Sequence, residues 1–196
     1  MSRVGPGETG LRRRAMALEF VTIAWNLLEG VLAIVAGLLA GSVALVAFGL
    51  DSSVEVFASA VVVWELRGVD RRRERRAVRA IGAAYLVVAV YILLDSGNAL
   101  RIANRPEASP IGMLLLAATV LVMAVLGIAK LRVGRELHSA TVTADGRFSL
   151  VDGSLAGAVL AGLALTALLG WWWADALLAI GISLLAFREG REAWIG

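Results

Sequence analysis

The sequence predicts an all-α membrane protein with six transmembrane helices and both termini in the cytoplasm. The chain has 196 residues and is 59% hydrophobic, whereas soluble domains are about 45–50% apolar. Its apolar residues form runs of about 20 residues, the length that a helix needs to cross a bilayer. Of the 19 Lys and Arg residues, only Arg101 and Arg105 fall on the outer side of this topology. The positive-inside rule therefore places both termini in the cytoplasm.

The first predicted element is a basic cytoplasmic tail at residues 1–14, and a six-helix transmembrane domain follows at residues 15–196. The first apolar run follows Arg12–Arg14 and lacks an A-x-A cleavage site, so we read it as a retained span rather than a signal peptide. Gly41 and Ser42 predict a tight turn into the second span. A loop with seven arginines at residues 67–79 separates the second span from the third.

The later boundaries follow turn-forming and polar residues. Two prolines in the segment 101–110 end the third span, and a polar stretch at residues 130–147 separates the fourth span from the fifth. Gly170 and three tryptophans mark the turn into the sixth span. Because the three outer connections are short, we expect three helical hairpins. The predicted spans are residues 17–40, 43–66, 80–100, 111–129, 148–169 and 174–187.

The composition excludes several classes of site. The chain has no cysteine and only one histidine, His138, which falls in a predicted loop. Disulfides, thiolate metal sites and His-rich metal sites are therefore excluded, and so are Ser-His-Asp and Cys-His catalytic arrangements. The glycines occur without the Lys-Ser/Thr pair of a nucleotide-binding loop. We therefore expect neither an enzyme nor an ATP-driven pump, and any transport would depend on an ion gradient.

Two carboxylates stand near the middle of the second span. Asp51 and Glu55 are four residues apart, so a helix places them on one face. An ionised carboxylate in hydrocarbon costs several kcal/mol, and such a residue faces a partner or a water-filled cavity. Asp152 lies in the fifth span, which runs in the opposite direction and could face this pair. These three residues are the strongest candidates for a binding site.

The predicted cluster of Asp51, Glu55 and Asp152 needs a counter-charge. No Lys or Arg lies deep in a predicted span, so the natural counter-charge is a bound cation. Protons compete with a cation for the same oxygens, which predicts coupling between metal arrival and proton release.

Other polar residues in the spans have weaker claims. Glu29 lies near the middle of the first span with Asn26 one turn earlier, and it is either a ligand or a helix–helix hydrogen-bonding residue. Asp95 lies near the outer end of the third span, where a gating or structural role is open. Asp175 lies at the outer start of the sixth span and is expected to be solvated or to cap a helix. His138 is expected to be a solvated loop residue.

Spans two and five resemble the transmembrane domain of the cation diffusion facilitators, which are proton-coupled exporters of zinc and manganese. Span two reads SVALVAFGLDSSVEV, similar to the family's S-x-A-L-x-x-D-x-x-x-S-x-x-D stretch, so Asp51 and Glu55 match its two ligand positions. Span five begins TADGRFSLVDGSLAG, in which Ala144-Asp145 matches the family's A-D lead-in and Asp152 its second ligand. The segment GWWWADALLAIGIS resembles the family's W-x-D-P-x-x-x-x-x-I start of span six.

The resemblance covers roughly residues 15–194 and has three departures. Phe148 stands at the first ligand position of span five and cannot bind a metal, and Glu55 replaces the usual Asp. The chain ends at Gly196, so we expect a small member reduced to the six-span transmembrane domain, without the family's cytoplasmic C-terminal domain. Glu29 is our hypothesis for the missing ligand, because of its depth and its neighbour Asn26.

The resemblance implies a multi-pass protein of the cell membrane that exports a divalent metal in exchange for protons. Zn²⁺ is the expected cargo, and the family also suggests Mn²⁺, Fe²⁺, Co²⁺ and Cd²⁺. A ligand set of three hard carboxylates without imidazole is better suited to manganese, iron(II) or magnesium than to zinc in its usual tetrahedral geometry. No resident cofactor is expected, and the Gly- and Ala-rich faces of the spans permit a homodimer.

Two alternatives remain open at this point. The same acids could serve another ion-coupled transporter or a channel, for example for an organic cation, which would require aromatic residues near the acids. Phe48 is one helical turn from Asp51. In the second alternative the protein is a non-transporting membrane subunit in which the acids only fix helix packing.

Overall fold

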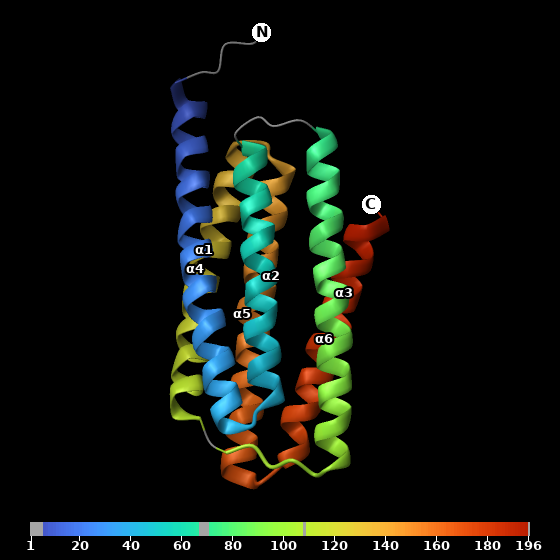
Figure 1. Cartoon of the computed structure of the whole chain (residues 1–196). Helices are drawn as coiled ribbons and strands as arrows, with labels where there is room; N and C mark the ends of the chain where they lie inside the picture. The colour runs from blue at the N-terminus through green and yellow to red at the C-terminus, as the bar shows by residue number, and fades with distance from the viewer. Residues whose placement is uncertain (1–5, 67–70, 108, 196) are drawn as a thin grey trace.

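The computed structural model describes residues 6–66, 71–107 and 109–195, and these form six α-helices (Figure 1). The helices differ in length from 24 to 35 residues. Their bounds are α1 Pro6–Ala40, α2 Val43–Leu66, α3 Arg71–Arg101, α4 Pro110–Glu136, α5 Ala140–Leu169 and α6 Trp172–Ile195.

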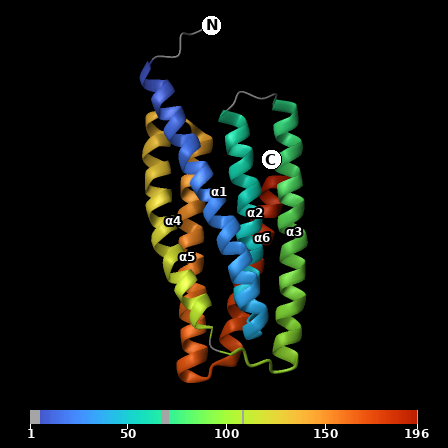
Figure 2. The same cartoon turned by 60° about the vertical axis from the view of Figure 1, so that its left-hand side comes forward.

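The helices lie roughly parallel to one another in a single bundle (Figures 1 and 2). We call the end of the bundle that carries the α1–α2, α3–α4 and α5–α6 connections the turn end, at the bottom of Figure 1. The opposite end, towards which both chain termini point, is the terminal end. The hydrophobic core runs between the helices and includes Phe48 of α2, Leu116 of α4 and Ala156 of α5.

The pairing of the helices differs from the predicted hairpins. The closest pairs are α4 with α5, α1 with α2, and α3 with α6. Short outer turns predicted the hairpin α1–α2 and the turn from α5 into α6, and both pairs of helices are in contact. The α3–α4 connection instead crosses the bundle and does not fold α4 back on α3 (Figure 2). The hairpin α4–α5 closes at the terminal end, through residues 137–139. The prediction of three successive outer hairpins is therefore confirmed for α1–α2 and α5–α6 and wrong for α3–α4.

The helices are also longer than the predicted spans. α1 begins at Pro6 and so includes most of the predicted tail, whereas residues 1–5 lie outside the described residues. α3 begins within the predicted arginine-rich loop, of which residues 67–70 are not described. The polar stretch at 130–147 is helical except around Leu137–Ser139. The apolar run marks only the part of a helix that lies in a non-polar environment. The helices extend beyond it because Arg, Lys and Glu are themselves good helix formers.

The turn end is held by hydrogen bonds between segments distant in sequence. Gly41 and Gly170 follow the ends of α1 and α5 with φ of 66° and 68°, a conformation that glycine adopts without steric cost. The buried Asp175 at the start of α6 accepts a hydrogen bond from the Ser42 hydroxyl at 2.5 Å and from the Ala44 amide at 3.2 Å. Asp175 therefore caps the start of α2 from a neighbouring helix. From the sequence, either this capping role or a solvated Asp175 side chain was expected.

The outward surface of the bundle is strongly apolar. Large side chains such as Leu39, Leu114 and Leu168 expose 81%, 74% and 82% of their area. By length and composition four of the described helices qualify as membrane spans, at Thr9–Ala40, Val43–Trp64, Pro110–Glu136 and Asp145–Leu169. An apolar outer surface on helices of this length is what a bilayer requires, since the helices satisfy their own backbone hydrogen bonds. The chain is a multi-pass membrane protein.

Glycines bring α1 and α2 close together beside the first of the central carboxylates. A Cβ atom at Gly49 would lie 2.8 Å from the Gly30 carbonyl oxygen and 2.9 Å from the Ile34 backbone nitrogen. Both neighbours are backbone atoms, so only a shift of one helix against the other could make room. This contact fixes the position along α1 at which the next turn of α2 packs.

Replacing Gly49 with Ala is expected to destabilise the bundle, because overpacking a fixed backbone contact costs about 1–3 kcal/mol. The measurement is the thermal unfolding midpoint of the purified protein in detergent. Gly97→Ala in α3 is the matched control, since a Cβ there meets nothing within 4 Å. Equal midpoints for the two variants would contradict the close approach of α1 and α2.

Candidate metal centre

Three carboxylates from two helices meet inside the bundle. Asp51 and Glu55 lie one turn apart on α2, and Asp152 lies on α5. Each offers an oxygen, and these oxygens all lie within 4.8 Å of one another. Asp51 and Asp152 are buried, with 7% and 1% of their area exposed, and Glu55 is partly buried. We call these three residues the carboxylate centre.

Within the described residues, the charges that act on Glu55 of the carboxylate centre are of one sign. The charged groups that act on Glu55 are all acidic: Asp152, Asp51, Asp145 and Glu29. Both carboxylate oxygens of Asp152 are buried and accept no hydrogen bond from the described residues. A buried carboxylate that accepts no hydrogen bond, as at Asp152, is strongly unfavourable when ionised, so it needs a cation or a proton. The spacing of the oxygens allows one ion to contact all three residues.

Helix α1 adds two polar side chains beside the centre. The Asn26 amide donates a hydrogen bond of 3.0 Å to Glu55, and Asn26 is fully buried. Glu29, also fully buried, accepts a hydrogen bond of 2.8 Å from the Thr119 hydroxyl of α4. Its second oxygen, Oε2, and the Asn26 carbonyl oxygen have no partner among the side chains and backbone groups described. Glu29 is thus near the centre but outside the group of three mutually close carboxylates.

Phe148, at the expected ligand position of α5, does not occupy the space of a missing ligand. Its side chain exposes 47% of its area, so the ring lies at the outer surface of the bundle. The next residue, Ser149, is buried and lies three residues before Asp152, on the same side of the helix. The interior face of α5 therefore runs through Asp145, Ser149 and Asp152.

A second buried ionic group, around Lys130, was not predicted from the sequence. Lys130 of α4 was assigned to a polar loop, yet its side chain is fully buried and forms ion pairs with Glu19 of α1 and Asp145 of α5. The expectation that no basic residue lies deep among the spans is therefore wrong. The apolar run ends at residue 129, but the helix and its packing continue. A useful signal was available in Glu19, which interrupts the first apolar run and needs a partner.

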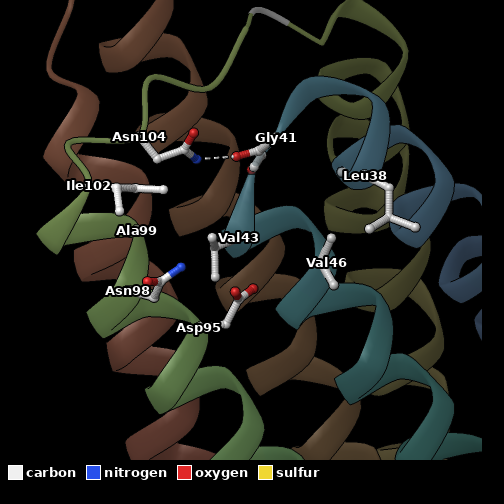
Figure 3. A pocket seen from close by; sticks show the side chains of 11 residues that line it. Leu38, Gly41, Val43, Val46, Asp95, Asn98, Ala99, Ile102 and Asn104 are labelled. Atoms are coloured by element: carbon white, nitrogen blue, oxygen red, sulfur yellow. Dashed lines mark hydrogen bonds between the residues drawn. The ribbon is translucent and has the colours of Figure 1, made fainter.

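Asp95 lies in a separate pocket at the turn end. A cavity of about 230 Å³ opens between the α1–α2 turn and the last turns of α3, and none of its lining residues belongs to the carboxylate centre. Figure 3 shows Asp95 and Asn98 on α3 beside Val43, and the hydrogen bond of 2.7 Å that Asn104 donates to the Gly41 carbonyl. Asp95 is half-buried. Asp95 therefore lies at the turn end of the bundle, apart from Asp51, Glu55 and Asp152.

His138 follows α4 with a φ of 51°, and its side chain is exposed. This position fits the solvated loop residue that the sequence predicted. The buried acids Asp145 and Glu19 form ion pairs with Lys130.

Comparison with known proteins shows the family. Residues 20–194 match the family described as the cation efflux transmembrane domain. The chain is 26% identical over 184 residues to magnetosome protein MamB of Magnetospira sp. (strain QH-2), covering 88% of this chain and 61% of the relative. It is 28% identical over 181 residues to MamB of Paramagnetospirillum magneticum (strain ATCC 700264 / AMB-1), covering 87% and 60%.

A third relative is Transmembrane protein 163 of Xenopus laevis, 24% identical over 164 residues, with 81% of this chain and 58% of the relative covered. The chain thus spans about three fifths of the length of these curated relatives. The family match extends over α1 to α6 and includes all three members of the carboxylate centre. The chain belongs to the cation efflux family, the cation diffusion facilitators.

Proposed function

We propose that this protein is a secondary transporter that exports a divalent metal ion in exchange for protons, with the carboxylate centre as its binding site. The observation that carries the proposal is the meeting of Asp51, Glu55 and Asp152, whose oxygens lie within 4.8 Å of one another. The charged groups of the described residues that act on Glu55 are all acidic. A divalent cation supplies the positive charge that this group needs. Protons supply it when the metal leaves, because a carboxylate binds one or the other.

The proposed ligand set is Asp51, Glu55, Asp152 and Glu29. The Oε2 atom of Glu29 is buried and, by hydrogen-bond geometry, accepts no hydrogen bond from the described residues, although the Trp25 side chain acts on Glu29. This supports a role of Oε2 towards the ion, while Thr119 holds the other oxygen. Zn²⁺ is the first expected cargo, from the family, with Mn²⁺, Fe²⁺, Co²⁺ and Cd²⁺ as further candidates. The all-oxygen donor set favours Mn²⁺ or Fe²⁺ over Zn²⁺ in this particular chain.

We place the protein in the cell membrane with six spans and both termini in the cytoplasm. α3 and α6 have 31 and 24 residues, long enough to cross the hydrocarbon core of a bilayer. Trp171 and Trp173 stack at 5.3 Å between ring centroids at the turn end, each partly exposed, as expected of aromatic anchors at a membrane interface. The terminal end is then cytoplasmic, and the partners are the metal ion, protons and lipid. A homodimer is consistent with the small residues on the helix faces.

The two alternatives find less support. An organic cation would need aromatic walls, yet Phe57 exposes 61% of its area and turns away from the bundle interior, while Phe48 packs within the hydrophobic core. A purely structural role for the acids is hard to reconcile with Asp152, whose two buried oxygens contact no donor in the described chain. A structural carboxylate would be expected to accept hydrogen bonds.

The test is flux in vesicles that contain only the purified protein. Uptake of Mn²⁺ and Zn²⁺ is followed with a metal-sensitive dye inside the vesicle, with and without an interior made acidic by a pH gradient. We expect saturable uptake that the gradient accelerates and that is accompanied by proton loss from the interior. Absence of flux for every divalent metal would favour the subunit alternative, and flux of organic cations alone would favour the other.

A further inference from the structure

Lys130 lies in a buried site of its own, built by three helices. Its ammonium nitrogen is 3.1 Å from Oε2 of Glu19 on α1, contacts Oδ2 of Asp145 on α5, and donates to the Ser149 hydroxyl at 3.3 Å. Lys130 and Glu19 are fully buried, and Asp145 and Ser149 expose 7% and 3% of their area. We call these four residues the lysine site.

The lysine site stands in a regular relation to the carboxylate centre. Asp145 precedes Asp152 by seven residues on α5, and Glu19 precedes Asn26 by seven on α1. Seven residues are two helical turns, or about 10 Å along the helix. Both helices run from the terminal end to the turn end, so the lysine site lies two turns nearer the terminal end. The same two helices therefore carry buried oxygen groups at both levels.

The charges of the lysine site do not balance. Two carboxylates face one ammonium, so the fully ionised group carries one surplus negative charge. Oε1 of Glu19 is buried and accepts no hydrogen bond from any residue in the described ranges. The other oxygen of the same carboxylate, Oε2, contacts the Lys130 ammonium, so the carboxylate faces a site that already holds a cation. A divalent ion in place of the ammonium would neutralise both carboxylates, with the Ser149 hydroxyl as a third oxygen donor.

We propose that Glu19, Asp145 and Ser149 form a second cation site, which the Lys130 ammonium keeps filled and which takes a divalent metal ion when that ammonium is removed. The tethered ammonium ties α1, α4 and α5 together without drawing an ion from solution. It also prevents cargo from lodging two turns away from the carboxylate centre. The chain therefore binds one divalent ion in its bundle although it buries two groups of carboxylates.

The test removes the carboxylate centre first, so that its outcome does not depend on the proposed transport function. The parent chain carries Asp51→Asn, Glu55→Gln and Asp152→Asn. Mn²⁺ binding is measured by calorimetry on the purified protein, with and without Lys130→Met. We expect no Mn²⁺ site in the parent and one site per chain after Lys130→Met. Adding Glu19→Gln should then weaken Mn²⁺ binding at least about tenfold, because even the loss of a group that only supports a metal ligand costs about 10- to 100-fold.

Lys130→Arg in the same parent is the matched control, because it keeps the positive charge and should keep the site closed to Mn²⁺. Stability gives a second readout. Lys130→Met leaves two buried carboxylates unpaired, so it should lower the unfolding midpoint, and Mn²⁺ should raise it again.

Three results would overturn the proposal. In the first, Lys130→Met binds no more Mn²⁺ than the parent. In the second, the new binding is unaffected by Glu19→Gln and by Asp145→Asn. In the third, the Lys130→Met chain cannot be recovered folded even when Mn²⁺ is present throughout purification, because a site that accepts the metal would replace the lost charge.

Discussion

Asp152→Asn is expected to abolish metal transport and to weaken metal binding by about 100-fold or more, which corresponds to about 2.7 kcal/mol of binding free energy. Asp152 is the only member of the carboxylate centre on α5, and it is 1% exposed. Asn keeps the shape of the side chain but removes its charge, so the ion loses one of the three groups that neutralise it. The measurements are Mn²⁺ and Zn²⁺ affinity by calorimetry and flux in vesicles.

Asp95→Asn is the matched control for this experiment. It makes the same chemical change in another helix of the bundle, but Asp95 lies in the turn-end pocket apart from the carboxylate centre. We expect its metal affinity to remain within about threefold of the unmodified protein. If Asp95→Asn weakened binding as much as Asp152→Asn, the effect would reflect general electrostatics or folding, and the assignment of Asp152 as a ligand would lose its support.

The second large effect is expected for Glu29→Gln, with metal affinity falling about 10- to 100-fold. The amide can still accept the hydrogen bond from Thr119, which measures 2.8 Å in the present protein. The substitution therefore preserves the contact between α1 and α4 while removing the charge. If Glu29 completes the coordination that Phe148 cannot provide, the loss falls on metal binding and leaves the unfolding midpoint in metal-free buffer little changed.

Thr119→Val separates ligation by Glu29 from its positioning. Val removes the hydroxyl donor but leaves the Glu29 charge, so we expect a smaller loss of affinity than for Glu29→Gln. Glu107→Gln, in the α3–α4 connection at the turn end, controls for removal of an acid outside the site. Unchanged metal affinity in Glu29→Gln would remove Glu29 from the ligand set and leave three carboxylates with water.

Much of the architecture could be predicted from the sequence because the physical constraint is strong. Long apolar runs predicted helices, and the structure has a helix over each of the six predicted spans. The turn at Gly41 and the boundary at Gly170 could be predicted because glycine readily adopts positive φ. Asp51 and Glu55 were assigned to one face from their spacing alone, since four residues make about one helical turn.

The pairing of helices could not be predicted in the same way. Nothing in the apolar pattern of α3 indicates that it packs on α6 rather than on α4, because its apolar segment carries large side chains on both sides, such as the buried Ile92 and the exposed Val87. The information lies in side-chain fit, such as the Ser183 hydroxyl of α6 donating to the Ala89 carbonyl of α3 at 2.8 Å. Contacts of this kind join residues distant in sequence and leave no local period.

The lysine site was missed for a related reason. A Lys at the end of an apolar run is usually at the membrane surface, with its ammonium in water. Lys130 is instead enclosed because α5 and α1 each place a carboxylate against it. One half of that arrangement, Asp145, was visible as part of a family motif, but its partner could only be identified once α4 and α5 were seen side by side.

The most direct test of the carboxylate centre is the position of a bound metal. Crystals of the protein grown or soaked with Mn²⁺ or Zn²⁺ would be measured at wavelengths on either side of the metal absorption edge. The account predicts one anomalous peak per chain, at coordinating distance from oxygens of Asp51, Glu55 and Asp152, and no peak in a chain with all three replaced by amides. A peak at Asp95 or His138 instead, or one that persists in the amide variant, would contradict it.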